Sequence, residues 1–322
     1  PFDLLGLSPA PVLIILGIVL GQAFLAWTHR ARAQGRTPLL ALEVVDSPKE
    51  RSAVYALFVV VALEAALNFL VPLYIQIVQG RSPIATAVAM MPFNLTVFFT
   101  AMLVVRLYPI LAPRQIGRLG FALCTLALLW LAWVVRNDWS AVAVMFGLIA
   151  FGIGQGALVT LVFNVLVTAA PKELAGDVGS LRGTTQNLAA GVGTALAGAL
   201  LVGLLSSAIL YRVSENPRLP PVVLSQIDLD SINFVSNDRL LEIMQRTGAA
   251  PEVVQEAVQI NAESRLRALK IGLLVMACVS LLAIFPAGRL PAYRPGEIPA
   301  HPPVPAPGAA AAAIREDEDA NL

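Results

Sequence analysis

Residues 53–78 read AVYALFVVVALEAALNFLVPLYIQIV, an apolar run of 26 residues with a single charged side chain, Glu64. About 20 apolar residues in a helix cross the hydrocarbon core of a bilayer, because each residue adds about 1.5 Å. Backbone amides and carbonyls in lipid must pair within their own segment, which favours a helix over a lone strand. This stretch therefore predicts a membrane-spanning α-helix.

Six further apolar runs accompany this one. The chain of 322 residues is 57% hydrophobic and 13% charged, whereas ordinary soluble domains carry about 25% charged residues. We therefore predict an all-α membrane protein with seven spans. The other runs cover approximately residues 9–27, 83–107, 116–135, 141–169, 188–211 and 269–285.

The composition excludes several classes of function. The net charge of +1 lacks the basic excess of nucleic-acid-binding proteins, so we predict no nucleic-acid partner. The two cysteines, Cys124 and Cys278, lie in apolar runs, and the two histidines, His29 and His301, are far apart in the sequence. We find no catalytic constellation and predict no enzyme, no metal site and no cofactor.

Basic residues collect in alternate connections between the spans. Short loops rich in Lys and Arg stay on the cytoplasmic side. We therefore predict that the chain starts outside, and that its C-terminus lies in the cytoplasm beneath the cell (inner or plasma) membrane. The basic residues of these connections are Arg30, Arg32, Arg36, Lys49, Arg51, Arg106, Arg114, Arg118 and Lys172.

Glu64 is the one acidic residue deep within a predicted span. An ionisable group near the bilayer centre costs about 3 kcal/mol on insertion scales, and such groups commonly serve proton or ion transport. Asn68 lies one turn further along the same helix face. Pro72 has no N–H and so leaves the carbonyl of Asn68 without its helical partner. We predict that Glu64 carries a proton or attracts a cationic substrate; the alternative is a neutral Glu64 hydrogen-bonded between helices.

Other amides lie inside the predicted spans. Pro92 interrupts the third span and frees the carbonyl of Val88. Helices interrupted near a polar midplane are typical of transporter binding sites. The amides therefore predict a substrate cavity, with helix packing as the alternative. They are Asn94 in the third span, Gln155 and Asn164 in the fifth, and Gln186 and Asn187 in the sixth.

Small residues recur every four positions in the fifth and sixth spans. Such stripes allow close approach of two helix backbones. We interpret both stripes as helix-packing surfaces. They contain Gly152 and Gly156 in the fifth span, and Gly179, Gly183, Gly191, Ala195, Ala199 and Gly203 in the sixth.

Three sequence patterns resemble one transporter family. Residues 71–76 (VPLYIQ), followed by Gly80, Ser82-Pro83 and Met91-Pro92, resemble the segment LPLYLQ…G…SP…LP of the major facilitator superfamily. Specifically, they resemble its 14-helix drug:proton antiporter branch. Residues 106–114 occupy the place of that branch's basic cytoplasmic loop, and residues 152–176 resemble its GxGxG…P.E.AG stretch.

The resemblance implies an architecture. Residues 1–51 are an extra central transmembrane helix with a cytoplasmic connector, and residues 52–286 form the C-terminal six-helix bundle. Within the bundle, residues 212–266 are an outer loop whose pattern becomes helical at Pro251 and continues into the last span. Residues 287–322, rich in Pro and Ala, are expected to be a disordered cytoplasmic tail.

The resemblance also implies partners. The chain begins with Pro1 rather than Met, and we interpret it as a fragment. Its partners are then the missing N-terminal half of the same transporter, the lipid bilayer and a small-molecule substrate. Arg106 and Arg114 belong to a cytoplasmic gate loop.

The predicted function is proton-driven efflux of drug-like or metabolite molecules by alternating access, with the proton gradient as energy source. Two alternatives stay open. One is a metabolite uniporter or symporter of the same superfamily. The other is a non-transporting scaffold or sensor, against which the buried Glu64 argues.

Overall fold

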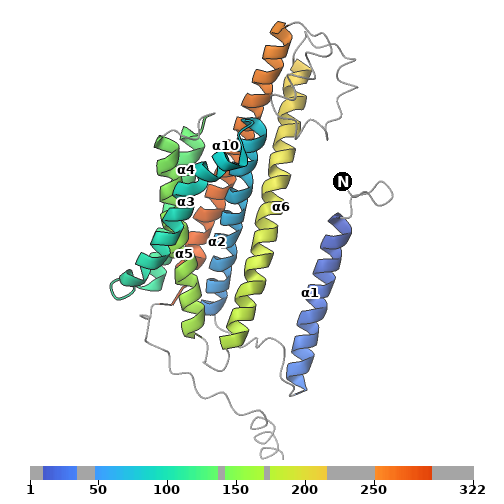
Figure 1. Cartoon of the computed structure of the whole chain (residues 1–322). Helices are drawn as coiled ribbons and strands as arrows, with labels where there is room; N and C mark the ends of the chain where they lie inside the picture. The colour runs from blue at the N-terminus through green and yellow to red at the C-terminus, as the bar shows by residue number, and fades with distance from the viewer. Residues whose placement is uncertain (1–9, 35–47, 137–141, 170–174, 216–250, 292–322) are drawn as a thin grey trace, which may run out of the picture.

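The computed structural model describes residues 10–34, 48–136, 142–169, 175–215 and 251–291. These ranges are helical and contain no strand, so the prediction of an all-α fold is confirmed. The helices run up and down in one bundle, with α1 standing apart (Figure 1). They are α1 (Ala10–Ala33), α2 (Pro48–Leu73) with the π-helix η2 (Tyr74–Val78), α3 (Pro83–Leu103) with the 3₁₀-helix η3 (Val104–Leu107), α4 (Pro113–Val134), α5 (Val142–Ala169), α6 (Ala175–Glu215) and α10 (Pro251–Ala287).

Six of the described helices are long and apolar enough to cross a membrane. They match six of the seven predicted runs, and α10 begins at Pro251 as the sequence pattern predicts. The remaining run, residues 188–211, lies in α6, which is helical but is not among the six. The structure describes side chains for only part of this run. The six spans are Pro11–Ala31, Glu50–Ile77, Pro83–Leu107, Pro113–Val134, Val142–Thr168 and Ala262–Ala287.

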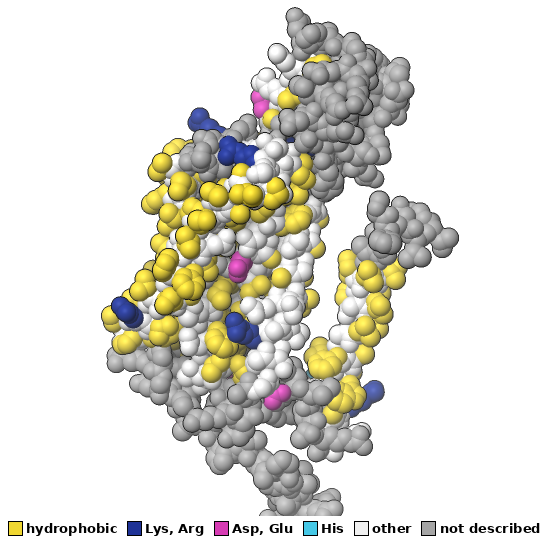
Figure 2. Space-filling view, in the orientation of Figure 1, with side chains coloured by type: hydrophobic (Ala, Val, Ile, Leu, Met, Phe, Trp, Pro, Cys, Tyr) yellow, Lys and Arg dark blue, Asp and Glu magenta, His cyan; other side chains and the backbone are white. Residues whose placement is uncertain are grey.

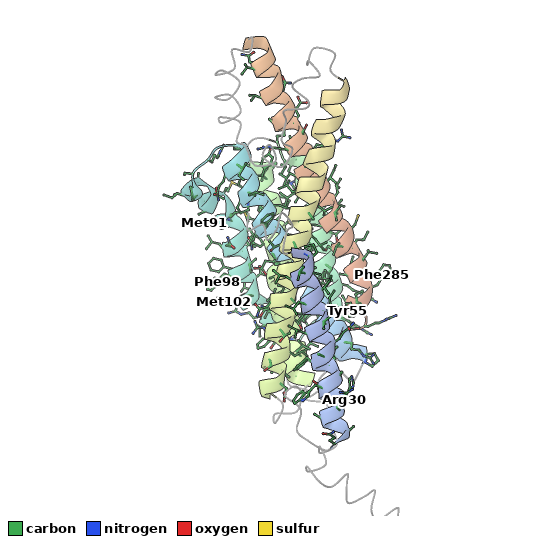
Figure 3. All side chains as sticks on the ribbon, turned by 90° about the vertical axis from the view of Figure 1, so that its right-hand side faces the viewer. Arg30, Tyr55, Met91, Phe98, Met102 and Phe285 are labelled. Carbon is green, nitrogen blue, oxygen red and sulfur yellow. The ribbon has the colours of Figure 1, made fainter. Side chains whose placement is uncertain are left out.

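Exposed hydrophobic side chains cover the outside of the bundle. Met91, Phe98 and Met102 project from α3, and Phe285 projects from α10 on the opposite side (Figure 3). Phe285 is 76% exposed. An apolar surface of this extent is unfavourable in water and favourable in lipid. The structure thus supports a multi-pass membrane protein.

The core of the bundle forms around α2 and α5. Helix α2 packs against α5, α6 and α10, while α5 also packs against α3 and α4. Leu57 and Leu67 of α2 and Phe151 of α5 are fully buried. The Phe151 ring lies 5.6 Å, centroid to centroid, from the ring of Phe93 on α3. Two helices with several apolar faces thus carry the packing of the others.

The small-residue stripe of α5 is a packing surface, as predicted. A Cβ atom on Gly152 would lie 2.9 Å from the Phe93 carbonyl oxygen, and one on Gly156 would lie 2.5 Å from that of Val97. Both distances are shorter than a carbon–oxygen contact allows. Glycine is therefore required where α5 crosses α3.

The stripe of α6 makes no packing contact within the part of the chain that the structure describes. A Cβ atom on Gly179, Gly183, Gly191 or Gly203 would meet nothing within 4 Å among the described residues. Contact with α2 is made instead by Gly193, where an added Cβ would clash with the backbone of Ala62. Gly193 is two residues from Gly191, on another side of the helix. The predicted stripe therefore faces away from the bundle.

The connection between α2 and α3 is a tight turn. Gly80 adopts a φ of 62°, in the left-handed region that favours glycine at helix ends. Ser82 then caps α3, because its side chain accepts a hydrogen bond from the Ala85 amide at 3.2 Å. Pro83 occupies the first helical turn, where its missing N–H costs nothing. Between Pro72 and this turn, η2 has π-helical geometry, which often marks functional sites.

Parts of the predicted organisation lie outside the described residues. These are the connector at 35–47, most of the tail at 292–322, and the middle of the outer loop at 216–250. Both ends of that loop are helical, since α6 extends to Glu215 and α10 begins at Pro251.

Candidate functional site

The structure brings Glu64 of α2 and Gln155 of α5 together inside the bundle. The Gln155 Nε2 donates a hydrogen bond to Glu64 Oε2 at 3.3 Å and another to the Val60 carbonyl oxygen at 2.8 Å. Gln155 has 0% exposure, whereas Glu64 is partly exposed. The carboxyl group therefore has one side anchored to α5 and another side accessible.

The residues of α2 next to Glu64 are polar on one side of the helix and apolar on the other. Asn68, one turn on, is exposed on the same face of α2. Leu63, next in sequence, and Leu67, which flanks Glu64 on the side away from Asn68, are buried. A carboxyl group so placed can exchange a proton or contact a cation from the open side.

The amide of Asn94 bonds to its own helix. Its Nδ2 donates to the Met90 carbonyl oxygen at 3.1 Å, and the Thr96 hydroxyl donates to the Pro92 carbonyl oxygen at 2.6 Å. Helix α3 continues through Pro92 to Leu103. Asn94 is exposed, and neither residue has a described hydrogen bond to Glu64.

Asn164 ties α5 to the end of α3. Its Nδ2 donates to the Tyr108 hydroxyl oxygen at 3.1 Å and to the Thr160 carbonyl oxygen at 2.9 Å. Tyr108 is buried directly after η3. Burial raises the pKa of the Tyr108 hydroxyl, and the hydrogen bond from Asn164 opposes part of that rise, so the hydroxyl is protonated at neutral pH. The predicted gate-loop residues Arg106 and Arg114 flank this tie and are exposed.

We expect Tyr108→Phe to destabilise the protein modestly, because it removes an acceptor while the Asn164 amide keeps its bond to Thr160. The loss should be about 1 kcal/mol, or a fall in Tm of about 2–4 °C, measured by thermal unfolding in detergent. Tyr55→Phe is the matched control, because Tyr55 is exposed on α2 (Figure 3). Equal Tm values for the two variants would contradict a stabilising role for the Asn164–Tyr108 bond.

The two amides of α6 differ in their surroundings. Gln186 is half-buried, whereas Asn187 is exposed on the face that carries the small-residue stripe. The structure therefore separates the predicted cavity residues. Asn68 and Gln155 lie near Glu64, Asn94 is exposed in the middle of α3, Asn164 contacts Tyr108 just after η3, and Gln186 and Asn187 lie on α6.

Two arginines went unnoticed as candidate site residues. The Arg182 guanidinium of α6 lies 4.1 Å from the ring centroid of Phe163 on α5, a cation–π contact. Arg265 of α10 is 2% exposed and lies near Tyr74 of η2. In the sequence, these two arginines are distinguished only by their position close to or within an apolar run. The described residues contain no group of three or more metal-ligating His, Cys, Asp or Glu.

The sequence has relatives among known proteins. It is 24% identical over 284 residues to the multidrug resistance protein Stp of Mycobacterium tuberculosis, covering 87% of this chain and 51% of the relative. It is 24% identical over 210 residues to a probable actinorhodin transporter of Streptomyces coelicolor, covering 63% of this chain and 36% of the relative. It is 22% identical over 214 residues to the multidrug efflux pump LfrA of Mycolicibacterium smegmatis, covering 66% and 42%.

The chain thus spans about half the length of the first of these relatives. Their names agree with the predicted resemblance to drug:proton antiporters. A family model described as Major Facilitator Superfamily matches residues 4–194, which is more than half of the 322 residues. Together with the helical bundle and its apolar outer surface, this match shows that the chain belongs to the major facilitator superfamily.

Proposed function

We propose that the complete protein exports small molecules across the cell membrane in exchange for protons, and that Glu64 carries the proton. The observation that carries this proposal is the position of Glu64. In the six described spans, the other acidic residues, Glu50 and Glu263, lie within two residues of a span end. Glu64 lies in the middle of its span and faces an open, polar side. Intramembrane carboxyl groups with this placement commonly take part in proton transfer.

The free face of α6 supports a two-part transporter. Asn187 and the small-residue stripe are exposed on it, and α6 shows mostly neutral, non-hydrophobic atoms beside the hydrophobic outer helices (Figure 2). A surface of this kind suits protein or water better than lipid. We assign it to the N-terminal half of the transporter, which would enclose the substrate between the two halves.

Alternating access then requires the halves to rock about the site containing Glu64 and Asn68. On the cytoplasmic side, the loop with Arg106 and Arg114 would move with α5, to which the Asn164–Tyr108 bond ties it. The chain ends in the cytoplasm in this arrangement. The substrates are drug-like or metabolite molecules, by analogy with the relatives named as efflux proteins. A proton gradient supplies the energy, with no cofactor.

The test uses inverted membrane vesicles that contain the complete protein. Ethidium is a suitable probe because its permanent positive charge complements a carboxylate. An acidic vesicle interior should drive ethidium accumulation as protons leave, and a protonophore should abolish it. Accumulation that continues unchanged with the protonophore would contradict proton exchange.

A further inference from the structure

Gln155 is the only described residue of α5 with a side-chain hydrogen bond to the backbone of α2. Its Nε2 carries two hydrogens, and both are engaged on α2: one by the Val60 carbonyl oxygen and one by Glu64 Oε2. Val60 precedes Glu64 by one helical turn. The amide group therefore holds the carboxyl group and the α2 backbone at once.

The other end of the same amide is unsatisfied. Gln155 Oε1 is buried and accepts no hydrogen bond from the described residues. A buried acceptor without a donor is unfavourable, by about 1–3 kcal/mol. An ionised Glu64 offers only acceptors and cannot satisfy this oxygen. The observed arrangement thus suits the ionised carboxylate but leaves one polar atom unsatisfied.

Protonation of Glu64 changes which partner the amide needs. A neutral carboxyl group has one O–H donor. The terminal torsion of a glutamine side chain has two broad, roughly equivalent settings, so the amide can exchange the positions of its oxygen and nitrogen. After this turn, Oε1 accepts from the Glu64 O–H, and Nε2 no longer reaches the Val60 carbonyl oxygen. The tie between α5 and the α2 backbone is then released.

We propose that Gln155 is a positioning residue that converts the protonation state of Glu64 into a tight or loose contact between α2 and α5. With Glu64 ionised, the Gln155 amide clamps the two helices together. When Glu64 binds a proton from water, the amide turns and the clamp opens; loss of that proton to water closes it again. This inference rests on the proposed proton exchange at Glu64 and adds the step by which the bundle responds to it.

Few other ionisable groups compete for this role. Helix α5 has none, since its sequence from Val142 to Ala169 contains no acidic, basic, Cys or Tyr residue. Helix α6 contacts α2 where Gly193 lies against Ala62, and α10 contacts α2 where Gly272 lies against Leu70. These two contacts show which residues of α6 and α10 lie at the same height as Glu64. Counting from them, Cys278 of α10 is level with Glu64 and exposed. The other described ionisable groups on α2, η2, α6 and α10 lie at least about 12 Å away along the helix axes; the nearest are Tyr55, Arg51, Tyr74, Arg182, Lys270, Arg267 and Arg265.

The first test measures protons released when ethidium is added to the purified complete protein, as a function of pH. Gln155→Leu removes the donor to the carboxylate, so Glu64 should hold its proton more tightly. The pH of half-maximal release should move upward by about one unit or more, given the strength of hydrogen bonds to charged groups. An unchanged midpoint would overturn the proposal.

The matched control for this test is Ser280→Ala. Ser280 is a buried polar residue whose hydroxyl donates to the Phe121 carbonyl oxygen at 3.0 Å, tying α10 to α4. It has the same kind of bond between helices but no described contact with Glu64. Its variant should keep the wild-type midpoint. A midpoint shifted as far as that of Gln155→Leu would show that any lost tie between helices suffices, and would overturn the proposal.

A double variant that exchanges the two side chains, Glu64→Gln with Gln155→Glu, tests the pair while keeping the side-chain volumes nearly unchanged. Glu64→Gln should abolish ethidium-induced proton release. Adding Gln155→Glu places the carboxyl on α5 and the amide on α2, and should restore release to at least half of the wild-type level. The control double variant, Glu64→Gln with Asn164→Asp, adds a carboxyl to α5 about 13 Å further along the helix and should restore none.

The swap remains informative if Gln155→Leu does not fold, because Glu and Gln have nearly the same shape. Failure of the swap to exceed its control would overturn the clamp while leaving proton exchange at Glu64 intact. Proton release that persists in Glu64→Gln would instead overturn the proposed function, and the clamp with it.

Discussion

Gly193→Ala is expected to destabilise the bundle strongly. An added Cβ would clash with the Ala62 backbone, which lies two residues before Glu64. Backbone cannot rotate away as a side chain can, so α6 must shift from α2. Overpacking of this kind costs about 1–3 kcal/mol, and Tm should fall by about 2–4 °C for each kcal/mol. Thermal unfolding of the complete protein in detergent measures the loss.

The matched control for this variant is Gly191→Ala. A Cβ on Gly191 meets nothing within 4 Å among the described residues. Because the N-terminal half is proposed to lie on the face of Gly191, a second control is Gly198→Ala, where an added Cβ would meet only the Phe69 side chain of α2 at 3.6 Å, an ordinary contact distance. Gly198→Ala should be neutral or slightly stabilising, because alanine favours helix by about 1 kcal/mol over glycine. A Gly193→Ala protein as stable as Gly198→Ala would mean that α6 does not pack closely on α2 at Gly193.

Glu64→Gln is expected to reduce ethidium accumulation driven by a pH gradient to below a tenth of the wild-type level. The amide keeps the size and much of the hydrogen bonding of the carboxyl but cannot exchange a proton. The variant should keep a Tm within about 2 °C of the wild type in detergent, because the shape of the side chain is retained. A retained Tm would distinguish loss of transport from loss of folding. Vesicle assays of accumulation and thermal unfolding provide the measurements.

Glu263→Gln is the control for the loss of a carboxylate. Glu263 is exposed near the start of its span and accepts a hydrogen bond from Gln259 at 2.9 Å. Its variant should accumulate ethidium like the wild type. Wild-type accumulation in Glu64→Gln would remove Glu64 from the transport cycle.

The sequence predicts helices well where burial in lipid sets their length. The spans of α2, α3, α4, α5 and α10 follow from apolar runs, and the start of α10 at Pro251 follows from its pattern. The contact face of α6 does not follow. Small residues at four-residue spacing look the same whether they face a neighbouring helix or an opening, and only the position of Ala62 against Gly193 decides the case.

The candidate site is predicted in part for a similar reason. Glu64 stands out because a carboxyl group in an apolar run is costly. The polar residues Gln155 and Asn164 also stand out, but their partners are 91 and 56 residues away in the sequence. A polar side chain in an apolar helix signals that it needs a partner without naming it. Arg265 was missed because its position just before the last apolar run resembles an ordinary helix flank.

Carbodiimide labelling of Glu64 in the purified complete protein tests whether a proton and a substrate alternate at this carboxyl group. Carbodiimides modify protonated carboxyl groups in apolar surroundings, and mass spectrometry of the peptide that contains Glu64 quantifies the product. If Glu64 exchanges its proton for a cationic substrate, labelling will decrease as pH rises and will decrease again when ethidium is added. Labelling that responds to neither pH nor ethidium would contradict a coupling role for Glu64.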